Sequence, residues 1–240
     1  MRLHIINPNS SAAMTAQITR VARSCALHGT ILDIGNPATT PVSIEGHADE
    51  ALSVPAMLAA IARADADGAD AHVVACFDDP GIGAAREVSP NPVIGLCEAS
   101  VRVALTLSKR FSVVTTLPRS VPLIEDLVEH YGASRQCRDV RAINLPVLEI
   151  ERNAGEALGR LATEIRACRE NGAEAVVLGC AGMADLCARL TEQTGVLVID
   201  GVVSAVKLAE ALAGTGYRTS KSGAYAAPYQ KAGGFAQEVA

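Results

Sequence analysis

Two stretches of the chain decide how it folds: Ala71-His72-Val73-Val74-Ala75-Cys76 and Ala175-Val176-Val177-Leu178-Gly179-Cys180. Each is a nearly continuous apolar run that ends at a cysteine, and such runs are typical of strands buried on both faces of a parallel sheet. Cys180 follows Cys76 by 104 positions, and another strand-like pair, Pro92–Gly95 and Val196–Ile199, has the same spacing. The match predicts that one structural unit occurs twice in the chain.

The segments around these runs extend the repeat. The predicted helix starts at Ser100 and Ser204 keep the same spacing, and Ile5–Asn9 resembles Val113–Leu117 at a slightly larger spacing. We therefore expect loops of different lengths in the two halves. Strand-like and helix-like segments alternate along the rest of the chain, which predicts an α/β fold with parallel sheets wrapped by helices.

The duplication predicts two pseudo-symmetric subdomains. Each should be a three-layer α/β/α unit built on a parallel sheet, with the active site in the cleft between them. We expect residues 1–98 and about 205–240 to form the subdomain that carries Cys76, and residues 99–204 to form the one that carries Cys180. From Gly214 onward the composition shifts to Gly, Ser, Ala, Tyr and Lys, which predicts a loosely held tail.

Composition and charge exclude several classes of function. The chain has 240 residues, a net charge of −5 and no basic block. We expect no nucleic-acid partner, because phosphate binding needs a clustered positive face. No apolar run reaches the roughly 18–20 residues that span a bilayer, and the first residues read as a strand rather than a signal peptide. These patterns favour a cytoplasmic protein that does not bind membranes.

The cysteines and histidines lack the spacings of a disulfide framework or a metal site. Seven cysteines stand at positions 25, 76, 97, 137, 168, 180 and 187, and five histidines are scattered. In a reducing compartment these cysteines should be free thiols. We expect no metal site.

Cys76 and Cys180 are predicted to lie beyond the carboxyl ends of their strands, where open α/β sheets bind ligands. Matched positions in two repeats would place one thiol on each face of a bound molecule. One thiol could then remove a proton from a carbon acid while the other returns a proton from the opposite face. A helical element follows each cysteine, and a helix N-terminus can lower the pKa of a thiol. The other five cysteines are interpreted as small buried hydrophobes, which is the usual state of a free cysteine.

Four motifs resemble the aspartate/glutamate racemase superfamily, and within it the branch of hydantoin and allantoin racemases. They are Ile6-Asn7-Pro8-Asn9-Ser10-Ser11, Ser43-Ile44-Glu45-Gly46-His47 with Asp49-Glu50-Ala51, Ala75-Cys76-Phe77-Asp78-Asp79-Pro80-Gly81, and Val177-Leu178-Gly179-Cys180-Ala181-Gly182-Met183. The similarity covers almost the whole chain. It implies a cofactor-independent racemase of 5-monosubstituted hydantoins, a small-molecule substrate, and a homo-oligomer. Cys76 and Cys180 would exchange the proton at ring carbon C5, which lies next to a carbonyl and is acidic enough to need no metal or pyridoxal cofactor.

One departure from the wider superfamily bears on the substrate. Amino-acid racemases of this fold follow the first cysteine with Asn-Thr and the second with Thr, and these residues hold the α-carboxylate. Here Phe77-Asp78 and Ala181-Gly182 take these positions. Burying a carboxylate without partners is costly, so a less charged ring fits better.

Further binding residues are predicted at the strand ends. Asn9 and Ser10 follow the first strand and could bind the substrate. Alternatively, they only form a turn and cap the next helix. Thr115 and Thr116 end the matched strand of the other half and could also bind the substrate. Alternatively, they occur there only because threonine is common in strands.

The cysteine loops add other candidates. Backbone N–H groups around Phe77, Ala181 and Gly182 could hold the substrate carbonyl as it gains enolate charge. Glu45 could accept a hydrogen bond from a ring N–H, or be a solvated loop charge. Asp78-Asp79, which precede Pro80-Gly81, are interpreted as turn residues.

Three alternatives stay open at this point. An allantoin racemase would apply the same chemistry to a ring with a ureido substituent. Decarboxylases and cis–trans isomerases of the same fold form a second enzyme class, although the decarboxylases keep only one of the two thiols. A non-catalytic binding module for small molecules would depend on neither cysteine.

Overall fold

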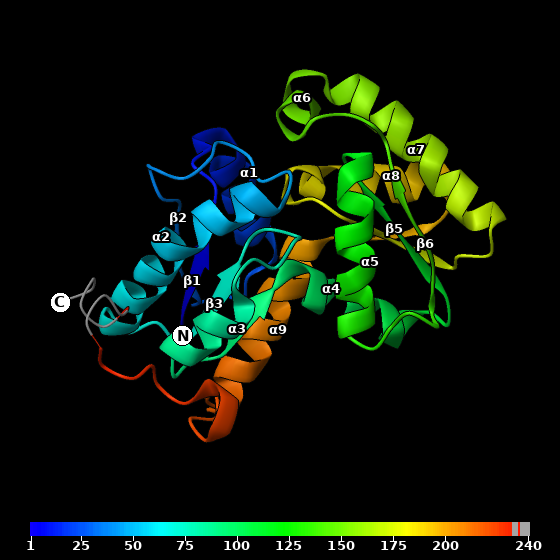
Figure 1. The fold of residues 1–240 in the computed structure, drawn as a ribbon. Helices are drawn as coiled ribbons and strands as arrows, with labels where there is room; N and C mark the ends of the chain where they lie inside the picture. Colours follow the sequence, from blue (N-terminus) through cyan, green and yellow to red (C-terminus); the bar gives the residue numbers. More distant parts are fainter. Residues whose placement is uncertain (232–234, 236–240) are drawn as a thin grey trace.

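The computed structural model describes residues 1–231 and residue 235 of the chain. Within these residues, eight strands form two four-stranded sheets, and every strand pair is parallel (Figure 1). The predicted α/β architecture with two parallel sheets is confirmed. Residues 232–234 and 236–240, which the sequence assigns to the first subdomain, lie outside the described residues.

The two sheets have the same strand order. The first sheet runs β2-β1-β3-β4 and the second runs β6-β5-β7-β8. The strands are β1 (Arg2–Ile6), β2 (Ile31–Gly35), β3 (Ala71–Val74), β4 (Val93–Gly95), β5 (Phe111–Thr115), β6 (Cys137–Ala142), β7 (Ala175–Leu178) and β8 (Leu197–Ile199). Their registers also agree, since Leu3 pairs with Ala71 in one sheet and Phe111 pairs with Ala175 in the other. The duplication in the sequence is therefore present in the hydrogen-bonded backbone.

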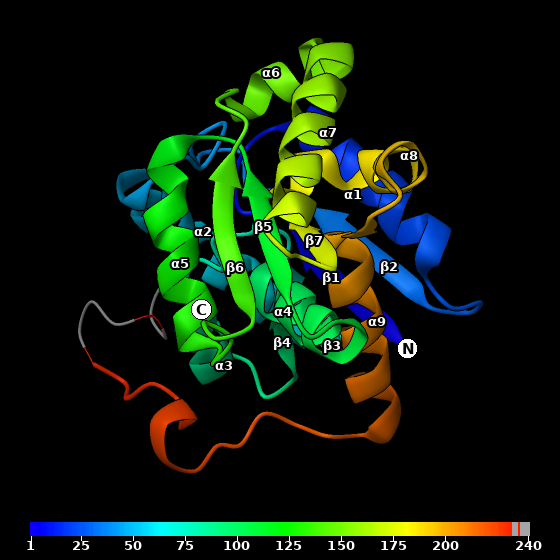
Figure 2. The ribbon, with the colours of Figure 1, turned by 90° about the vertical axis from the view of Figure 1, so that its right-hand side faces the viewer.

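Helices flank the sheets (Figure 2). They are α1 (Ala12–Cys25), α2 (His47–Ala66), α3 (Ile82–Val88), α4 (Leu96–Leu107), α5 (Val121–His130), α6 (Val147–Arg152), α7 (Ala154–Glu170), α8 (Cys187–Thr194) and α9 (Gly201–Thr215), with short 3-10 helices η1 (Pro118–Ser120), η2 (Ala181–Leu186) and η3 (Gly223–Tyr225). Among the described residues, each helix is too short or too polar to span a lipid bilayer.

The two halves share one apolar core. It contains Val73 of the first sheet and Val177 of the second, and residues of α1, α4 and α9 pack among them. Separate clusters lie under the outer helices, with Ile61 of α2 on the first sheet and Ile165 of α7 on the second. Burial of both sheet faces explains why the central strands read as continuous apolar runs. Helix α9 packs against α1 and β3, so it completes the first half, and it also contacts α4 where the two halves meet.

The sequence pattern does not predict strand β6. Its residues, Cys-Arg-Asp-Val-Arg-Ala, bury only Val140, because β6 is the edge strand of the second sheet. Charged side chains on an edge strand prevent it from pairing with another chain, and they also remove the apolar pattern by which strands are recognised.

The prediction of a loosely held tail is wrong for the segment after α9. The backbone N–H of Thr219 donates to the carbonyl of Pro90 at 2.9 Å. The ammonium group of Lys221 donates to the carbonyls of Arg86 and Glu87 near the end of α3. Polar groups thus tie this segment to the C-terminal end of a helix, where unpaired carbonyls attract a cation.

Candidate active site

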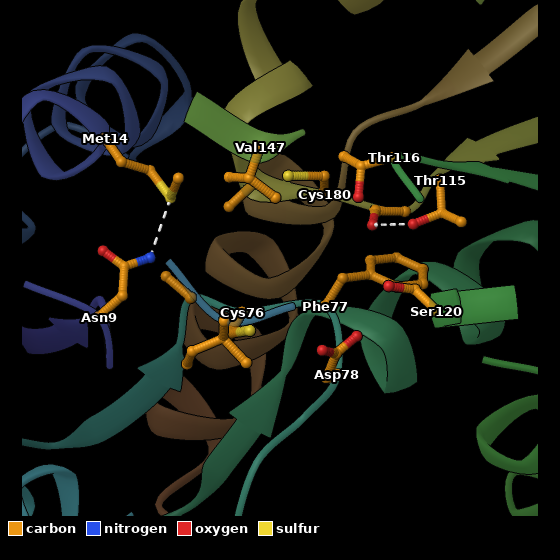
Figure 3. Close-up of a pocket in the computed structure, with 14 residues that line it drawn as sticks. Asn9, Met14, Cys76, Phe77, Asp78, Thr115, Thr116, Ser120, Val147 and Cys180 are labelled. Atoms are coloured by element: carbon orange, nitrogen blue, oxygen red, sulfur yellow. Dashed lines mark hydrogen bonds between the residues drawn. The ribbon is translucent and has the colours of Figure 1, made fainter. Parts of the chain in front are cut away.

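A narrow pocket lies at the carboxyl ends of the central strands, and Cys76 and Cys180 line it from opposite halves of the molecule (Figure 3). Its cavity volume is about 30 Å³, which is room for about two water molecules. The other residues that line it are Asn9, Met14, Ile44, Ala75, Phe77, Asp78, Thr115, Thr116, Ser120, Val147, Gly179 and Ala181. The pocket therefore collects the segments that follow β1, β3, β5 and β7.

Matched backbone bonds position the two cysteines. The N–H of Ala75 donates to the carbonyl of Ile6, and the N–H of Gly179 donates to the carbonyl of Val114, each at 2.8 Å. In both halves, pairing with the neighbouring strand thus continues up to the residue before the cysteine. The two thiol side chains lie on opposite sides of the pocket (Figure 3).

Burial dominates the acidity of both thiols. It raises the pKa of Cys76 well above its usual value and raises the pKa of Cys180 to about 12. Each thiol also accepts a hydrogen bond from a backbone N–H two residues later, at Asp78 and Gly182, and this contact lowers its pKa. The contact from Gly182, in the first turn of η2, has the direction expected of a helix N-terminus, but desolvation outweighs such contacts at both thiols.

Two acidic residues follow the first cysteine and differ in their surroundings. Asp79 is a turn residue, as the sequence predicts, with φ of 46°. Its buried carboxylate accepts from the N–H groups of Cys97 and Glu98, which start α4, and from the hydroxyl of Tyr131. Asp78 instead lines the pocket, and its carboxylate has no hydrogen-bond partner among the described residues. Burial raises the pKa of Asp78 to about 6.

Most of the predicted binding residues lie in the pocket lining: Asn9, Phe77, Thr115, Thr116 and Ala181. The Thr115 hydroxyl donates to the carbonyl of Gly179 at 3.0 Å, so it holds β5 against the second cysteine loop. The Asn9 amide lies 3.2 Å from the sulfur of Met14, a weak acceptor that leaves the amide able to bind a ligand. Thr116 adds a buried hydroxyl to the lining.

The remaining predicted residues lie outside the lining. The N–H of Ser10 donates to the carbonyl of Pro41, and the N–H of Gly182 contacts the second thiol. The carboxylate of Glu45 accepts from the N–H of Val147 at 3.0 Å. Glu45 therefore connects a loop of the first half to the start of α6, rather than facing the pocket.

Sequence reasoning did not assign seven of the lining residues to the site: Met14, Ile44, Ala75, Asp78, Ser120, Val147 and Gly179. Met14 lies on the apolar face of α1 and reads as a core residue. Ile44, Ser120 and Val147 come from loops and helix starts far apart in the chain, and no local pattern brings such segments together. Asp78 does have a signal in the sequence, because its carboxylate comes two residues after a strand-end cysteine. The following Pro80-Gly81 led to its interpretation as a turn residue.

The lining carries neither Lys nor Arg among the described residues. Its polar groups are two thiols, one amide, the hydroxyls of Thr and Ser side chains, and the Asp78 carboxyl. No cluster of three or more His, Cys, Asp or Glu side chains suited to a metal ion occurs in residues 1–231 and 235. The arrangement can hold a small neutral molecule between two sulfur atoms and exchange a proton with it.

Comparisons with known proteins identify relatives along the whole length. Residues 3–209 match the family model described as Asp/Glu/Hydantoin racemase. The chain is 60% identical to a hydantoin racemase of Rhizobium meliloti, covering 97% of both chains. It is 44% identical to a hydantoin racemase of Pseudomonas sp. (strain NS671), covering 96% of this chain and 93% of that one. Among solved structures, an allantoin racemase from Klebsiella pneumoniae superposes with a TM-score of 0.94 at 45% identity, covering 97% of this chain and 95% of that one.

Proposed function

Because the chain belongs to the Asp/Glu/hydantoin racemase family, we propose that it interconverts the enantiomers of 5-monosubstituted hydantoins by exchanging the proton on ring carbon C5. One observation carries this proposal: Cys76 and Cys180 face one narrow pocket from opposite halves, and the lining has no Lys or Arg among the described residues. A flat, uncharged ring suits such a slot. It enters by displacing water and by moving flexible side chains such as that of Met14.

The proposed reaction uses one thiolate and one thiol. The thiolate removes the proton from C5 on one face of the ring, and the electron pair moves onto the neighbouring carbonyl oxygen as an enolate. The opposite thiol then gives its proton to C5 from the other face and becomes the thiolate. The reverse direction exchanges the two roles. A buried thiol with a raised pKa is a strong base once ionised, which suits a weakly acidic C–H bond.

The polar side chains of the lining can hold the ring in place. Asn9, Thr116 and Ser120 provide hydrogen-bond donors for ring carbonyls, including the one that becomes the enolate oxygen. Asp78 provides an acceptor for a ring N–H. An amino acid would instead bring a carboxylate into a lining that has no Lys or Arg among the described residues to pair with it, which is costly in a buried site.

Allantoin racemisation is the second candidate. It uses the same proton exchange, and a solved allantoin racemase shares 45% identity with this chain. The 60% identity to a hydantoin racemase favours the first candidate.

The cellular setting is also part of the proposal. The seven cysteines are unpaired, which supports a reducing, cytoplasmic location. A homo-oligomer stays part of the proposal because the resemblance to the racemase family implies one. The packing of α9 against α1 and β3 supports a first subdomain of residues 1–98 and about 205–240, and a second of 99–204.

The test is a direct assay of the purified protein. L-5-benzylhydantoin and (S)-allantoin are incubated separately, and optical rotation is followed to its end point. If the optical rotation of L-5-benzylhydantoin decays to zero faster than that of (S)-allantoin, the result supports hydantoin racemisation. If the rotation of (S)-allantoin decays faster, the result favours allantoin racemisation. A protein that leaves both rotations unchanged contradicts the racemase proposal.

A further inference from the structure

A second cavity adjoins the catalytic pocket through a single shared residue, Asp78. We call it the side groove, and its other lining residues are His47, Glu50, Leu123, Asp126, Leu127 and His130. The side groove lies between the start of α2 in the first half and α5 in the second. Its volume is about 380 Å³, against about 30 Å³ for the slot between the thiols.

The difference in size decides where each part of a substrate can go. The slot has room for a flat ring only after small adjustments of its walls, so a substituent on the ring must leave it. The side groove meets the slot at the first cysteine loop and is large enough for a chain of several carbon atoms. A ligand cavity of a few hundred cubic ångströms is the usual size for a small molecule.

The chemistry of the side groove is mixed and acidic. Leu123 and Leu127 of α5 give it an apolar wall, and Glu50 and Asp126 provide carboxylates. His47 and His130 complete the lining, and the His47 ring lies 3.8 Å from the Glu50 carboxylate. Asp78 lies at the junction, partly buried and without a hydrogen-bond partner among the described residues, so its carboxyl is available to a ligand. No Lys or Arg belongs to the lining as the structure describes it.

We propose that the side groove is the subsite for the C5 substituent, and that it selects substituents with an apolar stem and a cationic or N–H-rich end. The inference rests on the proposed hydantoin racemisation and adds a substrate preference to it. Methylene groups pack on Leu123 and Leu127, and the terminal group meets the carboxylates of Glu50 and Asp126. Burial and the nearby charge of Glu50 raise the pKa of Asp78 to about 6, and His47 acts in the opposite direction. Above pH 7 the charge of Asp78 therefore adds to the preference. A substituent that ends in a carboxylate is repelled.

The experiment compares three hydantoins of similar length on the full-length protein at pH 8. Their substituents are 4-aminobutyl, pentyl and 3-carboxypropyl, and kcat/KM for racemisation is measured by circular dichroism at low ionic strength. The expected order is aminobutyl, pentyl, carboxypropyl. Partly exposed charge pairs contribute modestly, so each carboxylate should account for a preference of about two- to fivefold for aminobutyl over pentyl.

Variants then assign the preference to the side groove. Glu50→Gln with Asp126→Asn should bring the aminobutyl-to-pentyl ratio close to one, and raising the salt concentration should reduce the wild-type ratio. Glu129→Gln is the matched control, since it removes one charge from an exposed position of α5 that is not in the lining of the side groove. Because each ratio is measured within one variant, losses of folded protein cancel.

The outcomes separate the two proposals. An equal rate for all three hydantoins, or a preference that survives the double variant, overturns the side-groove assignment and leaves the racemase proposal intact. Failure of the wild-type protein to racemise 5-pentylhydantoin contradicts the racemase proposal itself, and the subsite with it. A loss of preference in Glu129→Gln as large as in the double variant also overturns the assignment, because it would reflect only the overall charge.

Discussion

Cys76 is followed by an open turn that carries Asp78 and Asp79, whereas Cys180 is followed directly by the 3-10 helix η2. After burial, the charge of Asp78 is the largest factor that raises the pKa of Cys76, and Asp79 adds to it. Around Cys180, Asp78 and Glu45 act in the same direction, and its pKa rises to about 12. The two halves therefore repeat a backbone but give the two thiols unequal surroundings.

The same contrast appears one element later in each half. Helix α9 is capped by the residue just before it, because Asp200 accepts from the N–H of Val203. Helix α4 begins after Gly95, which has no side chain to cap it, and the distant Asp79 fills that role. A Cβ at Gly95 would lie 2.3 Å from the Asp79 carboxylate, so glycine is required there. In the first half, the cysteine loop and the helix start are thus one connected structure.

The largest expected effect tests whether both thiols are needed. Cys76→Ser and Cys180→Ser should each lower the racemisation rate at least about a thousandfold, because a hydroxyl is a much weaker acid than a thiol and does not ionise to a useful extent near neutral pH. In D₂O, each variant should still exchange the C5 proton of the one enantiomer whose proton faces the remaining thiol, which NMR detects. Cys25→Ser, at the end of α1 and outside the pocket, is the control and should behave as wild type. Near-normal racemisation by both single variants rules out the two-thiol reaction.

Next in size is the loss of the distant cap. Asp79→Ala leaves two buried N–H groups and the Tyr131 hydroxyl without an acceptor, and should cost about 3 kcal/mol of unfolding free energy. Asp200→Ala removes an ordinary local cap and should cost about 1 kcal/mol. Urea unfolding followed by far-UV circular dichroism measures both. If both variants lose the same unfolding free energy, the contacts of Asp79 with the start of α4 stabilise the protein no more than a local helix cap does.

A smaller effect comes from the residue before each cysteine, which is Ala75 in one half and Gly179 in the other. A Cβ at Gly179 would lie 3.0 Å from the Cβ of Thr115, so Gly179→Ala should cost about 1–3 kcal/mol through overpacking. Ala75→Gly should cost about 0.5–1 kcal/mol through backbone entropy alone. Thermal melting gives the ranking, and a Gly179→Ala variant that melts with the wild type would mean that β5 and β7 separate easily.

The smallest effect concerns charge. Since burial raises the pKa of both thiols, kcat should increase with pH from 7 to 9 as the thiolate fraction grows. Asp78→Asn removes a negative charge that raises the pKa of both thiols, so the kcat–pH profile should move to lower pH. At pH 7 this corresponds to a gain on the order of threefold in thiolate-dependent kcat, if the ring is held equally well. Asp67→Asn, an exposed position at the end of α2, should leave the profile in place. A shift to higher pH contradicts the assigned sign.

How far the sequence predicts this structure depends on the element. The two strand-end cysteines and their spacing predict both sheets and the pocket, because buried parallel strands leave a strong apolar pattern. Strand β6 leaves no such pattern, since its position at a sheet edge favours charge. Helix α3 is too short and too rich in glycine and alanine, over Ile82–Val88, to show a clear helical pattern in the sequence.

The pocket lining divides in a similar way. Asn9, Thr115 and Thr116 follow strands, and the topology of the sheet brings strand ends together, so they could be located; their roles in binding stay predictions. Ser120 and Val147 reach the pocket through tertiary packing that has no local signature. The raised pKa of the thiols could not be predicted either, because it depends on how completely the two halves exclude water.

The packing of α9 on the first half has a consequence for biosynthesis. A nascent chain that has left the ribosome only as far as β8 contains every strand of both sheets, yet the apolar surface of α1, α4 and β3 is still uncovered. Segments of a growing chain generally fold as they emerge. Here we expect the amino-terminal half to stay open to chaperones until synthesis is nearly finished, while the later half can already close.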